Sequence, residues 1–544
     1  MANGERIGYG RAGGGVAVTD GEEAAGVGGG AGMEPQEPPT TIPGILRKLG
    51  PGLILAGSIV GSGELIATTA AGAEAGFVLL WLIILGCVIK VFTQIELAKY
   101  AISSGETTLK ALNAIPPVAS VQVGRRSLRA NFIVLFWLAM FLTGLAQLGG
   151  IVGGVGQAMS ISVPLTAEGR EYNETVGEKV QLEAKIAELE EAEEDGEVTN
   201  LEEIREAAQE AIDEVAALPA TTDDKWWAAI IGVVTIVLLV RGGFRFIETF
   251  CTVLVGAFTL ITIVNLIALQ SHDAWAVSWA EIRSGLSFQL PMTEAGMSGA
   301  ALGTALAAFG IIGVGAAELV GYPYWCLEKG YGAWIGPREE GEAWLRRARG
   351  WLRVLKWDAW CSMVIYTFST VAFYLLGAAI LGRTGLRAEG TEMVRTLAVM
   401  YEPVFGRGAQ LIFLVGAFAV LFSTFFVANA QKARLMTDVG DVFGFVKLTP
   451  ATRRLGIKFF SVVFPALCVL IYVLIPKPGV LVKVSGVMQA LLLPLLGIAA
   501  LYYRYRRTDK RLRGGKVWDA MLWLSFICFA VVGIYLAGNK LGAW

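Results

Sequence analysis

Eleven long apolar runs dominate this sequence of 544 residues, and they constrain its fold more than any other feature. Most of them have the length of about 17 to 25 residues that a helix needs to cross a bilayer. They lie at 50–72, 77–97, 131–160, 226–240, 247–269, 299–325, 358–381, 408–430, 459–476, 484–503 and 517–537. Only 17% of the residues are charged, against roughly 25% in a soluble globular protein. The sequence therefore predicts an all-α polytopic membrane protein and excludes a soluble enzyme, a nucleic-acid-binding protein and a disulfide scaffold.

The basic residues predict how the chain is oriented in the membrane. With a cytoplasmic N-terminus, the segments on the cytoplasmic side hold 31 of the 45 Lys and Arg residues. Such an excess is typical of cytoplasmic loops. Lys90 is the only basic residue within a predicted span. We therefore expect a cytoplasmic N-terminus and an external C-terminus. We also expect the protein to be a monomer in the cell (inner) membrane.

The spans also predict how the chain is divided. A long external insertion stands out, because Glu168 to Glu214 carry 18 acidic residues against four basic ones. Its acidity either attracts cations or forms a solvated surface. The predicted parts are a disordered cytoplasmic tail at 1–43, spans 1–3 at 44–160, an external acidic helical hairpin at 161–224, spans 4–5 with an external loop at 225–298, spans 6–10 at 299–516, and span 11 with the C-terminus at 517–544.

Two similar hexapeptides lie inside the first and the sixth run. Residues 60–65 read Val-Gly-Ser-Gly-Glu-Leu, and residues 314–319 read Val-Gly-Ala-Ala-Glu-Leu. These two spans cross the membrane in opposite directions under the predicted topology, so ten spans form two inverted halves of five. Inverted repeats with interrupted helices at matching positions are typical of secondary transporters, whose substrate binds near the bilayer midplane. We therefore predict a 5+5 inverted repeat in which spans 1 and 6 are discontinuous.

Each hexapeptide combines helix-weakening glycines with a glutamate. Glycine costs up to about 1 kcal/mol relative to alanine inside a helix, and a carboxylate in mid-span costs at least about 2.5 kcal/mol. Glycines also allow helices to pack closely, but packing does not explain why each segment ends in a glutamate. The predicted substrate-binding residues are Gly61, Ser62, Gly63 and Glu64 in span 1 and Gly315, Ala316, Ala317 and Glu318 in span 6.

Short motifs scattered over residues 45–510 resemble the natural resistance-associated macrophage protein (Nramp) family. The motifs are Gly50-Pro51-Gly52, Ala70-Ala71-Gly72-Ala73, Leu79-Leu80-Trp81, Gln94, Ser104-Gly105, Arg453-Arg454 with Pro465, and Leu493-Pro494. The resemblance implies the leucine-transporter (LeuT) fold, in agreement with the inverted repeat. It implies a distant relative whose metal-binding motifs are altered.

The family's metal-binding chemistry does not carry over to this sequence. The family has Asp-Pro-Gly-Asn in span 1, where this chain has residues 61–64, and Met-Pro-His-Asn in span 6, where this chain has residues 317–320. Acidic residues that serve proton transfer in the family's span 3 are Gly144 and Gln147 here. We therefore expect a different cargo from the family's transition metals.

Two classes of cargo fit the altered motifs. A Gly-Ser-Gly break exposes backbone N–H groups beside a helix N-terminus, an arrangement that binds anions, and Ser62 adds a hydroxyl. Alternatively, Glu64 and Glu318 coordinate a hard divalent cation such as Mg²⁺, Mn²⁺ or Ca²⁺. An anion beside these glutamates needs a compensating cation, because two like charges 4 Å apart repel by about 4 kcal/mol at an effective dielectric of about 20.

Several polar residues are candidates for ion coupling or for the transport pathway. Ser423 and Thr424 in span 8 either hold a coupling Na⁺ together with span 1 carbonyls or hydrogen-bond to their own helix. Lys90 either pairs with a glutamate or extends to the inner membrane interface. The predicted pathway residues Gln147, Gln489 and Asn429 either line the route or connect helices.

These features together predict a secondary active transporter, with Na⁺-coupled uptake of a small oxyanion such as bicarbonate as the first expectation. The alternative is a transporter of hard divalent cations, and a lesser alternative is a sensor without transport activity on the same scaffold. The sequence contains no nucleophile–base pair and no cofactor motif, so we expect no enzymatic activity and no cofactor other than Na⁺ as a coupling ion. The expected partners are a small inorganic ion and the lipid bilayer, without nucleic acid.

Overall fold

A computed structural model provides the architecture of the chain. It describes residues 34–123, 126–176, 221–242, 244–272, 274–293, 296–297, 299–388, 393–405 and 409–540, together with the isolated positions 182, 186 and 206. The side chains of Ser62, of residues 120–129 and of much of 244–255 are not among those described. Most of the tail at 1–43 and of the acidic hairpin at 161–224 lies outside the described residues, so both remain predictions.

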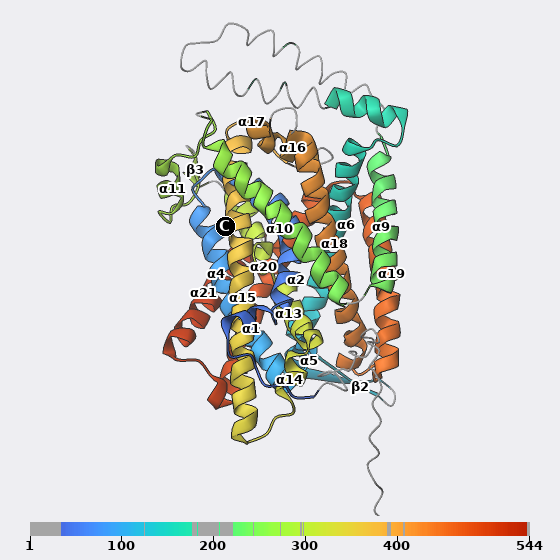
Figure 1. Ribbon diagram of the computed structural model, residues 1–544, viewed down its shortest axis with the longest axis vertical. Helices are drawn as coiled ribbons and strands as arrows, with labels where there is room; N and C mark the ends of the chain where they lie inside the picture. Colours follow the sequence, from blue (N-terminus) through green and yellow to red (C-terminus); the bar gives the residue numbers. More distant parts are fainter. Residues whose placement is uncertain are drawn as a thin grey trace, which may run out of the picture.

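Long helices form an elongated bundle (Figure 1). The membrane-length elements are α2 (Pro51–Ile59) with η1 (Val60–Thr68) and α3 (Thr69–Ala75), α4 (Leu80–Ser104), α6 (Phe132–Ser162), α9 (Asp223–Arg241), α10 (Phe244–Leu269), α12 (Gly299–Ile311) with α13 (Ala316–Lys329), α15 (Glu342–Leu376) with η2 (Gly377–Gly382), α18 (Ala409–Val442), α19 (Pro450–Leu474), α20 (Pro478–Tyr502) with η6 (Tyr503–Arg507), and α21 (Lys516–Lys540).

Short elements connect these helices at the two ends of the bundle. They are α1 (Ile42–Leu46), α5 (Thr108–Asn113), α11 (Trp279–Gly285), α14 (Tyr331–Ile335), α16 (Met393–Ala398), η4 (Val399–Tyr401), α17 (Glu402–Phe405), η7 (Lys510–Leu512) and two antiparallel pairs, β1 (Val118–Val123) with β2 (Arg126–Asn131) and β3 (Met292–Thr293) with β4 (Gly296–Met297).

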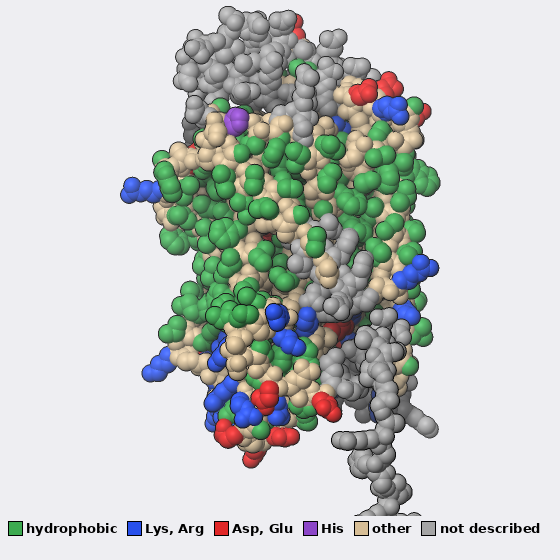
Figure 2. Space-filling model, in the orientation of Figure 1, with side chains coloured by type: hydrophobic (Ala, Val, Ile, Leu, Met, Phe, Trp, Pro, Cys, Tyr) green, Lys and Arg blue, Asp and Glu red, His purple; other side chains and the backbone are tan. Residues whose placement is uncertain are grey.

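The described residues contain eight helices that are long and apolar enough to cross a membrane, or nine if the bent pair in span 1 counts as one span. Helices α9 and α10 occupy the positions predicted for spans 4 and 5 but are not among these eight. The count of eleven spans and the inverted repeat therefore remain predictions. Figure 2 shows hydrophobic side chains over the middle of the visible face and most Lys and Arg side chains toward one end, as expected for a chain that crosses a bilayer.

The broken helix pair α12–α13 is the most buried of the eight candidate spans, whereas α19 and α21 are the least buried. Helices α4, α15, α18 and α20 pack around the pair and around α2. Non-helical backbone at membrane depth is tolerated where protein, instead of lipid, surrounds it. Because the pair is surrounded by other helices, the backbone polar groups that the interruption of span 6 leaves free do not contact lipid.

Span 1 is bent by 42° between Pro51–Ile59 and Gly63–Ala75. The bend lies at the start of the π-helix η1, so span 1 is interrupted by a change of helix type. Two threonine hydroxyls donate to carbonyls five residues earlier in this wider coil, Thr68 to Gly63 over 2.8 Å and Thr69 to Glu64 over 3.5 Å. The glycines therefore produce a bent π-helix, a feature that is frequent at functional sites, and the backbone continues without a gap.

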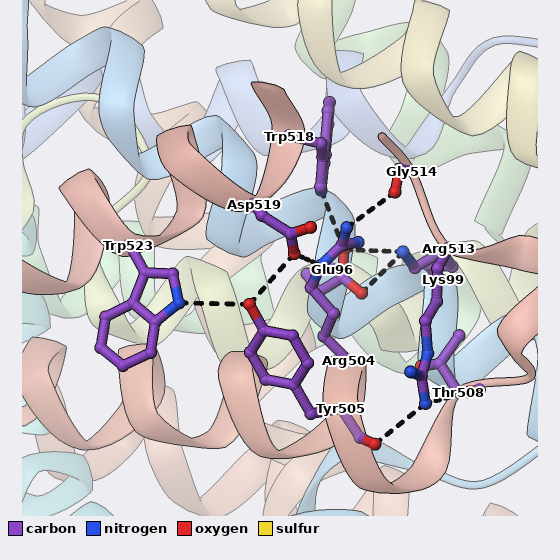
Figure 3. Close-up of polar contacts among 10 residues, drawn as sticks. All are labelled: Glu96, Lys99, Arg504, Tyr505, Thr508, Arg513, Gly514, Trp518, Asp519 and Trp523. Atoms are coloured by element: carbon purple, nitrogen blue, oxygen red, sulfur yellow. Dashed lines mark hydrogen bonds and ion pairs between the residues drawn. The ribbon is translucent and has the colours of Figure 1, made fainter. Parts of the chain in front are cut away.

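A cluster of buried charges attaches α21 to the rest of the bundle (Figure 3). Glu96 on α4 is completely buried and forms an ion pair with Lys99 at 2.6 Å. The same carboxylate accepts a 3.0 Å hydrogen bond from the Trp518 indole and lies 3.6 Å from the Arg504 guanidinium. Arg504 in turn pairs with Asp519 at the start of α21. Helix α21 is thus held to α4 by charged groups as well as by packing.

The Glu96→Gln variant is expected to lower the thermal unfolding temperature of the purified protein clearly. Removing one partner of a buried ion pair costs about 3–5 kcal/mol, because the remaining charges stay buried. Unfolding in detergent, followed by intrinsic fluorescence, measures the change. The matched control is Glu339→Gln at an exposed position, and an equal unfolding temperature for both variants would contradict the structural role of Glu96.

Candidate functional site

Span 6 is interrupted between α12 and α13. Helix α12 ends at Ile311, and Gly313 takes a φ of +55°, which a residue with a side chain rarely adopts. Gly315 has an extended backbone and forms the N-cap of α13. The interruption leaves carbonyl groups at the end of α12 and N–H groups at the start of α13 without partners inside the helix. The predicted break in span 6 is therefore present.

Lys90 caps the carbonyl end of this break. Its ammonium group donates to the carbonyl oxygens of Phe309 and, over 2.8 Å, of Ile312, and it lies 4.5 Å from the centre of the Phe309 ring. The side chain is completely buried. A cation at a helix C-terminus is favoured by the helix dipole. Lys90 therefore acts inside the bundle, and the alternative that it extends to the membrane interface is wrong.

The N–H end of the break is satisfied by Glu64 and Gln489. The Gly313 N–H donates to Glu64 Oε1 over 3.1 Å, and the Thr370 hydroxyl donates to the same oxygen over 3.0 Å. The Ala317 N–H donates to Gln489 Oε1 over 3.1 Å. Glu64 is completely buried, and its other oxygen, Oε2, has no hydrogen-bond partner among the described residues. One acceptor of Glu64 thus remains available at the break.

Glu318 lies in the first turn of α13, where the helix dipole favours a negative charge. Its carboxylate is close to Gly315, because a Cβ at that position would lie 2.6 Å from Glu318 Oε2 and 2.9 Å from Gln489 Oε1. A side chain at position 315 would therefore require the Glu318 and Gln489 oxygens to move. Glu64 and Glu318 therefore both lie beside the break in span 6, and their role in binding a substrate remains a prediction.

Gln147 and Gln489 belong to one polar network, whereas Asn429 does not join it. Gln489 Nε2 donates to Gln147 Oε1 over 2.9 Å, and the Ser485 hydroxyl donates to the same oxygen over 2.8 Å. The Asn429 amide donates to the Phe425 carbonyl of its own helix over 2.8 Å. Of the three predicted pathway residues, two are thus connected to the break through the Ala317 N–H.

The Gly-Ser-Gly segment of span 1 has a different geometry from the one expected. The segment lies within η1, so the helix N-terminus at the site belongs to α13, beginning with Ala316, and not to span 1. Gly61 and Gly63 allow close packing, because a Cβ at Gly61 would collide with Thr424 and one at Gly63 would lie 3.0 Å from the Ile311 carbonyl. The role of the Ser62 hydroxyl remains a prediction.

Ser423 and Thr424 face span 1. Both hydroxyls donate to the Gly57 carbonyl over 3.3 Å, and Ser423 also donates to the Val420 carbonyl over 2.9 Å. Two hydroxyl oxygens and a span 1 carbonyl therefore converge, and these oxygen atoms are the donor type that Na⁺ binds. The bonding of Ser423 to its own helix is present at the same time.

Lys432 is a site residue that the sequence analysis misses. Its side chain is 6% exposed, and the ammonium lies 4.7 Å from the centre of the Phe141 ring. A Cβ at Gly144 would meet this ammonium at 2.5 Å, so the glycine makes room for it. The predicted span 8 ends at residue 430, but α18 continues to Val442. The statement that Lys90 is the only basic residue within a span is therefore wrong.

Two carboxylates, those of Glu64 and Glu318, and the Lys90 ammonium thus lie at the break, and the Lys432 ammonium lies against Phe141 and Gly144 on α6. Electrostatic interactions connect Lys90 with Glu64 and Glu318, and Lys432 with Glu318. The Lys432 ammonium has no hydrogen-bond acceptor and no ion-pair partner within the described part of the chain. No group of three or more His, Cys, Asp or Glu residues that could hold a metal ion occurs among the described residues.

Hydrogen bonds to the Asp358 carboxylate connect the start of α2, helix α13 and helix α15. Asp358 on α15 is 1% exposed and accepts from the backbone N–H groups of Gly50 and Gly52, over 2.8 and 2.6 Å. It also accepts a 2.8 Å hydrogen bond from the Tyr322 hydroxyl on α13. This carboxylate therefore positions the start of α2 relative to the second half of span 6.

Residues 204–538 match the family model described as natural resistance-associated macrophage protein-like (Nramp), which covers more than half of the chain. The chain belongs to the Nramp family. The family resemblance found in the short motifs is therefore confirmed, and the protein is a multi-pass membrane transporter and not an enzyme. No curated protein matches the sequence.

Solved structures show that this Nramp-family chain has the LeuT fold. A mutant of the manganese transporter of Eremococcus coleocola is 16% identical, with a TM-score of 0.57 over 94% of this chain and 91% of that chain. MhsT in complex with L-phenylalanine is 15% identical, with a TM-score of 0.52 over 94% of this chain and 100% of that chain. Inward-facing Mhp1 is 15% identical, with a TM-score of 0.50 over 94% of both chains. At this level of identity the likeness concerns the fold.

Proposed function

We propose that this secondary transporter binds a small oxyanion, with bicarbonate as the first candidate, at the break in span 6. The observation that carries the proposal is the Lys432 side chain, which is 6% exposed, interacts electrostatically with Glu318 and has no hydrogen bond or ion pair among the described residues. An oxyanion would supply an acceptor for the N–H groups of this ammonium. The N-terminus of α13 adds a favourable dipole.

The charge balance at the break supports an anion. Lys90 and Lys432 together offset the charges of Glu64 and Glu318, so the compensating cations that an anion needs beside two carboxylates belong to the protein. A divalent cation is attracted by the two carboxylates and repelled by the two ammonium groups. Each ammonium within 4 Å would repel each of its charges by about 4 kcal/mol at an effective dielectric of about 20.

Na⁺ is the proposed coupling ion. Gly57, Ser423 and Thr424 contribute one carbonyl and two hydroxyl oxygens at one point between α2 and α18. Oxygen donors of this kind suit hard cations. Helix α2, which contains Gly57, continues into η1, which contains Glu64. Binding of Na⁺ at Gly57 and binding of substrate at the break are therefore connected through one bent helix.

A hard divalent cation is the second candidate, and the comparisons favour it over bicarbonate and Na⁺. The chain belongs to the Nramp family, and the similar structures from Eremococcus coleocola are of a manganese transporter. Within this chain, the unpartnered Glu64 Oε2, the Glu318 carboxylate and Gln489 Oε1 are oxygen ligands for such an ion. This candidate requires that the two ammonium groups move away or lose their protons.

Flux into liposomes tests both candidates. We expect the reconstituted protein to accumulate labelled bicarbonate when Na⁺ is added outside, and not when choline replaces Na⁺. Vesicles loaded with a metal-sensitive dye measure Mn²⁺ and Mg²⁺ entry in parallel. Cation entry without bicarbonate accumulation would reject the oxyanion in favour of the second candidate. Absence of any flux across the ion panel would favour the sensor alternative.

A further inference from the structure

The chain that precedes span 1 is bound to the end of the bundle where α1 and α14 lie (Figure 1). Residues 34–41 contain three prolines, Pro35, Pro38 and Pro39, and we call this segment the proline-rich strap. The strap contains no helix or strand, and it lies against α14 and the first half of α15. Because each proline ring fixes one backbone torsion angle, such a segment loses little conformational freedom when it binds.

Two tryptophans form the surface that the strap covers. Trp334 on α14 and Trp351 on α15 are 8% and 0% exposed, and their ring centres lie 4.5 Å apart. The Gln36 N–H donates to the Trp334 carbonyl, and the Trp351 indole donates to the Gln36 carbonyl, both over 2.9 Å. Glu37 adds an ion pair with Arg346, but this pair is exposed and contributes little. The strap is therefore held mainly by the two backbone groups of Gln36.

Two glycines make room for the strap. Gly350 lies inside α15, where alanine is the more favourable residue. A Cβ at Gly350 would collide with the ring of Pro38, and the three atoms nearest to this Cβ all belong to that proline. A Cβ at Gly336 would lie 3.0 Å from Pro35. Helix α15 thus carries a glycine that its own stability disfavours and that leaves space for the bound strap.

The strap continues through α1 into the start of span 1. The Lys48 ammonium, between α1 and α2, lies 4.8 Å from the centre of the Trp334 ring. The Lys48 carbonyl accepts a 2.9 Å hydrogen bond from the Tyr331 hydroxyl on α14. Two residues later begin the hydrogen bonds to the Asp358 carboxylate, which position the start of α2. The strap, the connection after α1 and the start of α2 are therefore attached to the same two helices, α14 and α15.

We propose that the proline-rich strap is an autoinhibitory element that holds the start of span 1 against α15. While the strap is bound, the chain on the N-terminal side of Gly50 is anchored, and α2 stays hydrogen-bonded to Asp358. Release of the strap from Trp334 and Trp351 allows this end of span 1 to separate from α13 and α15, and the break becomes accessible from this end. This gating does not depend on which cargo binds at the break.

Alkylation of Cys326 by N-ethylmaleimide measures the release in the full-length protein reconstituted in liposomes. Cys326 is 0% exposed and follows Tyr322 by one turn of α13, so its thiol reacts when this end of the bundle opens. Mass spectrometry of the alkylated peptides distinguishes it from the other cysteines. We expect about tenfold faster alkylation in Gln36→Pro, because loss of the hydrogen bond to Trp334 shifts the opening equilibrium toward the released strap.

Gln36→Ala is the matched control, because it keeps the backbone N–H and changes only an exposed side chain. It is expected to leave the alkylation rate unchanged. Gly350→Ala displaces the strap through Pro38 and is expected to accelerate alkylation as well, which provides a second test if Gln36→Pro fails to fold. Its control is Gly440→Ala on α18, where a Cβ would lie 3.9 Å from the nearest side chain and therefore makes an ordinary contact.

Cys468 on α19 is also completely buried and reports any general loosening of the bundle. Faster alkylation of Cys326 in a strap variant and not in its control, with Cys468 unchanged, would support the autoinhibitory role. An unchanged rate at Cys326 in both strap variants, an equal rate in variants and controls, or a parallel increase at Cys468 would overturn it. The proposed function is judged separately, by uptake into liposomes.

Discussion

The Lys432→Met variant is expected to lose anion uptake and to unfold at a lower temperature than the unmodified protein. Without this ammonium group, Lys90 alone offsets the charges of Glu64 and Glu318, so one buried negative charge is left uncompensated. Methionine fills similar space against Phe141 and Gly144. Uptake is lost because a hydrogen bond to a charged group contributes about 1.5–3 kcal/mol, which corresponds to a decrease in affinity of about 10- to 100-fold.

Bicarbonate uptake into liposomes and thermal unfolding in detergent measure the two effects on the same preparation. Lys458→Met is the control, because it makes the same substitution at an exposed position. The experiment also separates the two candidate cargoes by the direction of the change. If the cargo is a divalent cation, removing a nearby positive charge strengthens its binding and raises Mn²⁺ or Mg²⁺ entry at low concentration. Unchanged transport of both ions would exclude Lys432 from the site.

The Lys90→Ala variant is expected to lose both transport and stability, and small amines are expected to restore transport. Without the ammonium group, the carbonyls of Phe309 and Ile312 remain buried and unpaired. Each unsatisfied group costs about 1–3 kcal/mol, so the break in span 6 no longer keeps its geometry. A primary alkylammonium ion such as propylammonium fits the space that the side chain leaves and brings the same N–H donors.

Uptake in proteoliposomes, with and without propylammonium, measures the rescue. Tetramethylammonium is the matched control, because it carries the same charge without any N–H donor. We expect partial recovery with propylammonium and none with tetramethylammonium. Equal recovery with both amines would show that only charge matters at this position. Full activity of Lys90→Ala without any amine would contradict the capping role.

The sequence predicts the position of the break in span 6 because the break depends on local features. Gly313 and Gly315 weaken the helix, and Glu318 follows at the third position of the new helix, where it interacts favourably with the helix N-terminus. The contact between Glu64 and Gly313 joins two spans, and the repeated hexapeptides alone do not predict it. Local pattern therefore accounts for the position of the break, and the substrate-binding role of its residues remains a prediction.

Other features depend on contacts that a single sequence does not contain. The partners of Lys90 are about 220 residues away, with separations of 219 and 222 positions, so hydropathy alone cannot distinguish capping from extension to the interface. Glycine content indicates a weakened helix in span 1 but does not predict the π-helix η1 or the hydrogen bonds from the Thr68 and Thr69 hydroxyls within it. Lys432 is missed because a hydropathy window ends a span near the first charged residue, whereas α18 continues to Val442.

The charge balance around the break has a consequence for the transport cycle. With both carboxylates ionised and both ammonium groups protonated, Glu64, Glu318, Lys90 and Lys432 sum to zero. When the carrier without cargo reorients across the bilayer, these groups move no net charge, and the membrane voltage does no work on that step. Voltage therefore acts only on the step that carries cargo and coupling ion, so the electrogenicity of the cycle reports directly on the net charge of what is transported.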